Sequence, residues 1–347
     1  CKKLTTSKIQ PSALAYISGR PLVTGVIRST ADDFQVDENL GFEPAGKGEH
    51  ILLQIRKRHL NTEAVARQLA QLASVKLMDV GYAGLKDRMA STSQWFTVNL
   101  AGKPEPDWAV LACDDLQFLT VARHDRKLRR GALQSNRFSL IVRDLQGEIA
   151  DIEQRLVRIK QQGVPNYFGG QRFGHANLDR AAAMFAGQLR VKDRHQRSLY
   201  LSSARSELFN RVLSHRVTAG NWNRAVAGDV MMLEGTHSIF PVTQANAEIE
   251  ERVMQGDIHP TGPLWGRGEL RTGLDARQIE ENVLQECASW CRGLEQAELD
   301  QQRRSLRLRV QDLKWDFISS HEVQVQFGLP SGSYATMVLR EMVVCDI

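Results

Sequence analysis

The sequence predicts an α+β protein in which one domain is inserted into another. Period-two alternation, typical of strands, dominates the first part of the chain, and helical patterns dominate from about residue 176 to 300. Strand-type alternation returns from about residue 306 to the end. A chain of 347 residues is long enough for two domains, so the strand-rich ends are expected to form one around the helical middle.

The first part of the chain alternates repeatedly between strand patterns and turn residues. Expected strands cover residues 23–28, 32–36, 50–58, 94–100, 116–122 and 138–142. A helix capped by Asn61 is expected to run to about Leu77, and a second one ends near Gly163.

Composition changes at residues 165–174, which are rich in aromatic residues and glycine. Aromatic side chains among small and basic residues suit contact with nucleic acid, but they are equally compatible with a tight loop whose rings are buried. Helices are then expected over 177–185, 198–217 and 276–299, with irregular structure over 260–273.

Composition is typical of a soluble globular protein, with 42% hydrophobic and 24% charged residues. No apolar run approaches the roughly 18 residues that a membrane helix needs, and Lys2-Lys3 are not followed by the apolar core of a signal peptide. The five cysteines are odd in number and scattered, which argues against disulfides or a structural zinc site. We therefore expect a reducing, cytoplasmic setting.

Positive charge is modest overall but locally concentrated. The net charge is +5 with a pI of about 9.0, and residues 123–130 carry five Lys or Arg side chains in eight positions. Such a cluster neutralises phosphates and steers polyanions, although a solvated surface loop has the same composition.

The stretch from Gly81 to Arg88 (Gly-Tyr-Ala-Gly-Leu-Lys-Asp-Arg) is the strongest chemical motif. Gly81 and Gly84 permit a bend, after which Asp87 stands between two cations. A short carboxylate on a loop before a strand suits covalent catalysis, and a charged surface turn is the alternative.

Two glycine-rich segments resemble cofactor loops only in part. Residues 41–48 match the start of a phosphate-binding P-loop, but Gly48 replaces the Ser or Thr that binds Mg²⁺ and a strand follows. Residues 79–84 resemble a methyltransferase loop, but no helix opens behind them. We therefore expect no nucleotide cofactor at either segment.

Asn136 and Phe138 stand at the entrance of an expected strand. An amide followed by an aromatic ring can hold and stack a base, whereas a turn Asn followed by a core Phe would give the same pattern.

Four motifs occur together in one order: residues 83–87, 165–174, 202–210 and 329–336. In combination they resemble the TruD family of pseudouridine synthases over almost the whole chain. The resemblance implies a discontinuous α+β catalytic domain with a mixed or antiparallel sheet and an inserted α+β domain. Carried onto this chain, the catalytic domain covers 1–161 and 309–347, and the insertion covers 162–308.

The resemblance also implies a set of site residues. Asp87 matches the family's nucleophile, and Arg28 matches its basic partner, which is often Lys in the family. The residues that match substrate-contacting positions are Phe34, Asn136, Phe138 and Tyr334. Arg in place of Lys keeps the charge but changes the geometry of the pair.

The activity implied is isomerisation of uridine-13 to pseudouridine in tRNA, notably the tRNA for glutamate. The N1–C1′ bond breaks, the uracil rotates, and the base is rejoined through C5, either after attack of Asp87 at C1′ or through a glycal. Flipping the uridine out of its stack is expected to cost a few kcal/mol of free energy, because stacking is lost. No cofactor, metal or membrane is implied, and a monomer is expected.

Two other classes of function remain open from the sequence. A non-catalytic RNA-binding protein on the same scaffold would share the basic loop and the aromatic residues but would not need Asp87. A hydrolase with a carboxylate nucleophile would need a second carboxylate, for which Glu38 and Glu43 are candidates that nothing in the sequence brings to Asp87.

Overall fold

The computed structural model describes residues 13–345, which form two compact units. The sheet unit contains Leu22–Glu153, Val310–Ala335 and the chain from Val343; the helical unit contains Gln154–Arg309, Thr336–Met342 and the chain up to Pro21. Lys2 and Lys3, which carried the argument about secretion, lie outside the described residues. The boundaries at residues 162 and 308 stay a prediction.

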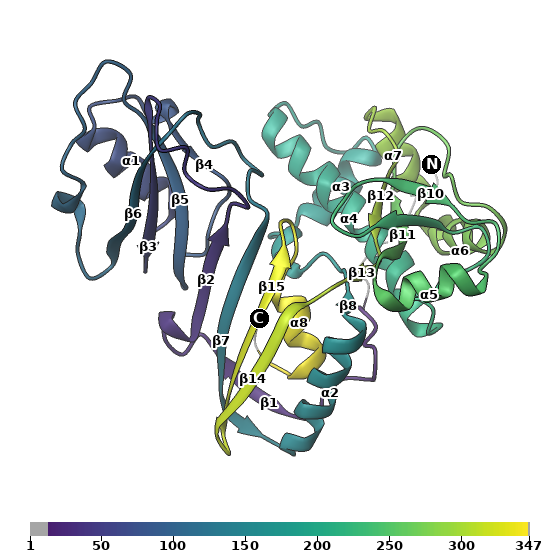
Figure 1. Ribbon diagram of the computed structural model, residues 1–347. Coiled ribbons are helices and arrows are strands. Elements are labelled where there is room, and N and C mark those ends of the chain that lie inside the picture. The colour runs from purple at the N-terminus through teal and green to yellow at the C-terminus, as the bar shows by residue number, and fades with distance from the viewer. Residues whose placement is uncertain (1–12, 346–347) are drawn as a thin grey trace. The chain divides into compact units, whose positions relative to one another are not determined.

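The sheet unit is built on one mixed, nine-stranded sheet within the described residues. Its order is β14-β15-β7-β2-β5-β3-β6, with β1 paired to β7 and β4 paired to β5 (Figure 1). Only β2 and β5 run parallel; the other pairs in this sheet are antiparallel. The strands are β1 Thr24–Ile27, β2 Phe34–Asn39, β3 His50–Lys57, β4 Val80–Tyr82, β5 Ser91–Asn99, β6 Leu116–His124, β7 Ser135–Gln146, β14 Gln311–Ser319 and β15 Glu322–Pro330.

Helix α1 (Thr62–Leu72) covers part of this sheet (Figure 1). Val65 and Leu69 are fully buried and pack with apolar side chains of β3 and β5 in one core cluster. The helix ends five residues before the expected Leu77 because Ser74 adopts a left-handed conformation with φ 51°. A non-glycine residue in that region stops a right-handed helix.

The helical unit combines helices with short strands. Helix α2 (Ile149–Gln162) enters it, and a four-stranded sheet of order β10-β9-β11-β12 lies within it. The remaining elements are β8 Val164–Pro165, α3 Asn177–Phe185, α4 Arg194–Thr218, β9 Val230–Leu233, β10 Ile239–Pro241, α5 Ala247–Gln255, β11 Ile258–Leu264, α6 Leu274–Leu284, α7 Ala288–Gln296, β12 Gln302–Ser305 and β13 Arg307–Leu308; α8 Ala335–Met342 follows near the end of the chain.

Two expectations for this unit were wrong in detail. The single helix expected over 276–299 is divided into α6 and α7, which a 3₁₀ turn at Gln285–Cys287 separates. The segment 260–273 is not wholly irregular, because β11 runs through its two prolines to Leu264. β11 pairs with β9 through its first three residues and with β12 through its last four, so each half has one free edge that tolerates a proline.

The aromatic segment 165–174 is largely internal. Tyr167 is 1% exposed and Phe168 is 7% exposed, so their rings pack inside the helical unit. For Tyr167 and Phe168, the prediction of a tight loop with buried rings is therefore confirmed.

Candidate active site

Asp87 lies on the loop between β4 and β5, and each of its carboxylate oxygens has a partner. Oδ2 is 3.2 Å from a terminal guanidinium nitrogen of Arg28, and Oδ1 accepts a hydrogen bond of 2.9 Å from the Met89 N–H. The side chain is still 38% exposed. The carboxylate is thus both oriented and accessible, as a nucleophile or a general base must be.

Arg28 reaches Asp87 from the end of β1 through an unusual backbone conformation. Its φ is 61°, in the left-handed region that non-glycine residues rarely adopt. Strain of this kind is concentrated at functional positions. The guanidinium carbon lies 4.4 Å from the centre of the Phe34 ring, and this cation–π contact fixes the cation between the ring and the carboxylate.

The two cations beside Asp87 in the sequence do not pair with its carboxylate. The Lys86 ammonium lies 2.6 Å from Oε1 of Glu38, whose side chain is fully buried, and Arg88 donates to the His59 carbonyl at 3.0 Å. The charge that faces Asp87 therefore comes from Arg28, far away in sequence. Glu38, one of the carboxylates considered for a hydrolase, is engaged in its own ion pair.

Lys57 is a further cation at this loop, and the motif search missed it. Its side chain is fully buried, and the ammonium donates to the Leu60 carbonyl at 2.8 Å and to the Asp87 carbonyl at 3.2 Å. Burial lowers the pKa of Lys57 to about 8, against the opposing effect of the Asp87 charge. On β3, Lys57 continues the alternating row of buried residues Ile51, Leu53 and Ile55. A lysine at an inward-facing position of a predicted strand was the feature of the sequence that could have identified it.

The aromatic candidates form a packed row beside Arg28. Phe34 meets Phe138 edge to face at 6.4 Å, and Phe138 stacks on Phe327 at 5.3 Å. Phe34 and Phe138 are 5% and 7% exposed, so they form the apolar wall of the site rather than an open stacking platform.

Asn136 lies at the end of this wall. It shares one face of β7 with Phe138, and across the sheet it pairs with Glu38 of β2 and Leu329 of β15. Its side-chain Oδ1 is buried and has no hydrogen-bond partner among residues 13–345. A buried acceptor without a partner is costly, and a bound donor would satisfy it.

A bidentate ion pair stabilises the turn between Arg28 and Phe34. Arg143 of β7 donates to Asp33 at 3.0 and 2.8 Å, and Asp33 accepts the Thr30 N–H at 2.9 Å. The guanidinium of Arg143 holds the pKa of the buried Asp33 carboxyl below its usual value. This pair fixes the connection that carries both Arg28 and Phe34.

Direct contacts thus join four predicted site residues, namely Asp87, Arg28, Phe34 and Phe138. Asn136 is linked to them by strand register, and the half-buried Tyr334 follows β15, which pairs with β7 at Phe138.

The basic cluster 123–130 lies beside the Asp87 loop. Leu128 anchors it, being 4% exposed, and its N–H donates to Thr97 Oγ1 at 3.0 Å. Directly after the cluster, the Gly131 N–H donates to the carbonyl of Ala83 at 2.7 Å. Basic side chains are therefore carried close to the loop that holds the carboxylate.

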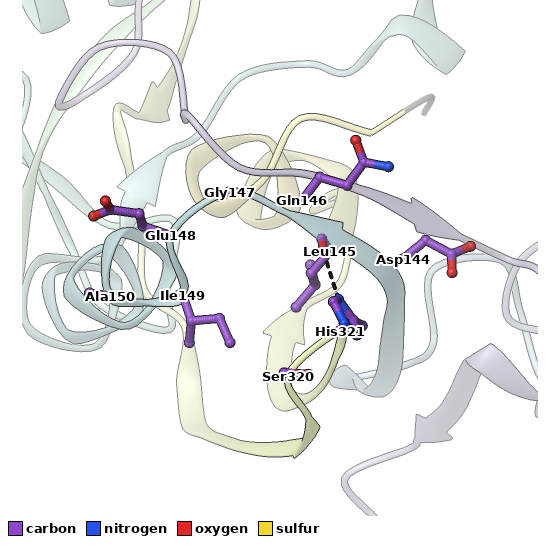
Figure 2. Close-up of a pocket in the computed structure, with 9 residues that line it drawn as sticks. All are labelled: Asp144, Leu145, Gln146, Gly147, Glu148, Ile149, Ala150, Ser320 and His321. Atoms are coloured by element: carbon purple, nitrogen blue, oxygen red, sulfur yellow. Dashed lines mark hydrogen bonds between the residues drawn. The ribbon is translucent and has the colours of Figure 1, made fainter.

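The candidate site does not coincide with the cavity of about 740 Å³ at the other end of β7 (Figure 2). That cavity is lined by residues 144–150 with Ser320 and His321, whose ring Nδ1 lies 3.4 Å from the Leu145 carbonyl oxygen. None of the predicted site residues lines it.

Comparisons with known proteins identify the family of this chain. The family model for tRNA pseudouridine synthase D matches residues 12–183 and 176–342. The chain belongs to the TruD family. Curated TruD relatives include the tRNA pseudouridine synthase D of Methylococcus capsulatus, 50% identical with 94% of this chain and 93% of that protein covered. That of Nitrosococcus oceani is also 50% identical, with 95% and 93% covered.

A crystal structure confirms the fold class. The chain described as a tRNA pseudouridine synthase D from Methanosarcina mazei matches with a TM-score of 0.74 at 22% identity, covering 95% of each chain. The mixed α+β architecture expected from the sequence is therefore confirmed.

Within residues 13–345, no helix has the length and apolar character to cross a membrane. Over the same range, His, Cys, Asp and Glu side chains form no cluster of three suited to a metal ion.

Proposed function

We propose that this protein converts uridine-13 of tRNA, notably the tRNA for glutamate, to pseudouridine, with Asp87 as the catalytic carboxylate. The names of its curated relatives support the class of reaction and the tRNA substrate. The observation that carries the residue assignment is the accessible Asp87 carboxylate, held at 3.2 Å by Arg28. We further propose that residues 1–161 with 309–347 form the catalytic domain and that 162–308 form the insertion.

In the proposed mechanism, Asp87 acts at C1′, either by direct attack or by promoting elimination to a glycal. The N1–C1′ bond breaks, the uracil rotates, and C5 bonds to C1′; C5 then loses its proton and N1 gains one, so substrate and product have the same atoms. Arg28 orients the carboxylate through their ion pair. The aromatic wall and Asn136 would hold the detached base, the open Oδ1 accepting a hydrogen bond from a base N–H, while Tyr334 would close the site.

The substitution Asp87→Asn tests the assignment, since the amide keeps the shape but cannot act as nucleophile or base. We expect pseudouridine formation to be lost while tRNA binding stays within about twofold, well below the fivefold change that corresponds to roughly 1 kcal/mol. Pseudouridine has the mass of uridine, so the readout is carbodiimide-based primer extension on tRNA from a deletion strain that carries each variant.

The matched control is Asp37→Asn, which changes a 47%-exposed carboxylate on neighbouring β2 and should leave activity intact. Single-turnover activity in the Asp87→Asn protein would show that Asp87 is not the catalytic group.

The second candidate is an RNA-binding protein without catalysis, which the basic cluster beside the Asp87 loop equally suits. The same assay separates the two functions. An unchanged pseudouridine pattern after deletion of the gene would favour the binding protein.

A further inference from the structure

The helical unit carries a groove lined by arginines that the proposed chemistry does not use. Its volume is about 650 Å³, in the range of ligand-binding clefts. We call it the arginine groove; its polar lining includes Arg172, Arg194, Arg197, Ser198, Ser202 and Arg205.

Helix α4 supplies most of this lining from one face. Residues 194, 197, 198, 202 and 205 recur at the three- and four-residue intervals that bring side chains together on a helix. Arg172 joins them from the 3₁₀ turn Gly170–Arg172, which precedes α3, and donates to the hydroxyl groups of Ser206, at 3.3 Å, and of Ser202. The groove is thus built on a rigid element.

No carboxylate side chain is among the groove-lining residues. In the part of the chain that the structure describes, none of the four guanidiniums forms an ion pair. The nearby Asp300 carboxylate is bound instead to Arg267, at 2.7 Å. Four like charges around one groove repel each other, and a bound polyanion would relieve that repulsion.

Arg205 shows the shortage of partners most clearly. It donates to two backbone carbonyls, Leu264 at 2.9 Å and Asp300, while its Nε is buried with no hydrogen-bond partner among the described residues. Backbone carbonyls orient a guanidinium without neutralising its charge. Arg194 and Arg197, by contrast, are exposed at the rim and free to contact a ligand.

The chemistry of this lining matches a phosphodiester chain. Guanidinium groups bind phosphate oxygens through paired N–H donors, and serine hydroxyls add further donors. We propose that the arginine groove binds the phosphate backbone of the tRNA substrate, as a contact separate from the residues that hold the uridine. This inference rests on the proposed function, which identifies the RNA as tRNA. It means that part of the free energy of tRNA binding comes from the helical unit.

The double substitution Arg194→Gln/Arg197→Gln tests the proposal without touching Arg205, whose Nε is buried. Binding of unmodified tRNA is measured by fluorescence anisotropy from 50 to 300 mM KCl. We expect affinity at 100 mM salt to fall by about tenfold, and the slope of log K against log salt to become shallower by about 1 per lost phosphate contact. Under single-turnover conditions with saturating enzyme, the rate of pseudouridine formation should be unchanged.

The matched control is Arg190→Gln/Arg292→Gln, which removes the same charge from two exposed arginines of the helical unit that do not line the groove. If both double variants bind tRNA alike, the groove is not an RNA contact and the proposal fails. It also fails if inorganic phosphate binds the wild-type groove but the groove variant keeps wild-type affinity for tRNA. Because binding is measured without catalysis, failure of the proposed function would show separately, as wild-type protein that binds tRNA but forms no pseudouridine.

Discussion

Asp87 is surrounded by charges whose partners could not be assigned from their order in the sequence. Its neighbours Lys86 and Arg88 turn to Glu38 and to a backbone carbonyl, while Arg28 and Lys57 arrive from other strands. The exposed carboxylate thus has a fixed counter-ion on one side and a buried ammonium behind its main chain. The electrostatics of the site are a property of the tertiary structure.

Lys57 should give the protein a measurable pH dependence of stability. Its pKa is lowered to about 8 by burial, below the value of about 10.4 for an exposed lysine. From about pH 8 to 10.5, Lys57 is protonated in the unfolded chain and deprotonated in the folded chain, so this group makes the free energy of unfolding rise with pH. Below pH 8 it is protonated in both states, and the amount by which it destabilises the fold is constant. Lys57→Met should remove up to about 1.4 kcal/mol per pH unit from that slope.

Urea unfolding at pH 7.5, 8.5 and 9.5 measures the effect. Lys47→Met, which changes an exposed lysine, should keep the wild-type slope. Equal slopes in wild type and Lys57→Met would contradict the assignment. The variant should also lose catalytic rate, because the Asp87 carbonyl loses its anchor.

At the scale of elements, the bend before Asp87 depends on close packing rather than on glycine's freedom of rotation. Neither Gly81 nor Gly84 is among the described residues with positive φ. Gly81 lies in β4, where an added Cβ would stand 2.5 Å from the Leu128 carbonyl oxygen and 2.6 Å from Thr97 Oγ1. At Gly84 the nearest atom, of Leu133, is 3.9 Å away. Gly81 therefore lets the basic cluster pack against β4.

Gly81→Ala should consequently destabilise the fold by about 1–3 kcal/mol, because the clash involves backbone that cannot move away freely. Gly84→Ala should stay within about 0.5 kcal/mol of wild type. Chemical denaturation followed by tryptophan fluorescence compares the two. Equal stability of both variants would show that β4 and the basic cluster are not in close contact.

At the scale of the whole molecule, each unit contains an apolar cluster of its own. The sheet unit buries Leu69 of α1 against β3 and β5, whereas the helical unit buries Leu208 of α4 among α3, α6 and α7. Each of these two clusters lies within the residues of one unit.

Leu69→Ala should therefore lower the free energy of opening of the sheet unit by about 2–5 kcal/mol and change the helical unit much less. Leu208→Ala should have the opposite pattern. Hydrogen exchange resolved by peptide and mass spectrometry reports both units in one experiment. Uniform loss of protection across the chain in either variant would mean that the units unfold together.

Much of the sheet, and the position of Asp87 on a loop before a strand, could be predicted from the sequence. Apolar residues such as Phe138, Leu140 and Val142 recur at every second position, which is the period of a strand. This periodicity can be read from one sequence alone. The order of four motifs was enough to indicate the family, and with it Asp87. Strand β11 was missed because its prolines are compatible only with the split pairing that its neighbours impose.

The sequence by itself determined the α+β class, the alternation of the strands and the carboxylate on its loop, because all three depend on residues close together in the chain. Only the tertiary structure decided the 3.2 Å geometry of the pair that the resemblance implied between Arg28 and Asp87, that Lys57 lies beneath Asp87, and that four arginines meet around one groove. Those arrangements depend on which strands pair and which helix face lines a cavity. The physical reason is that charge interactions follow distance in space, and distance in space is set by the sheet order and the packing rather than by sequence separation.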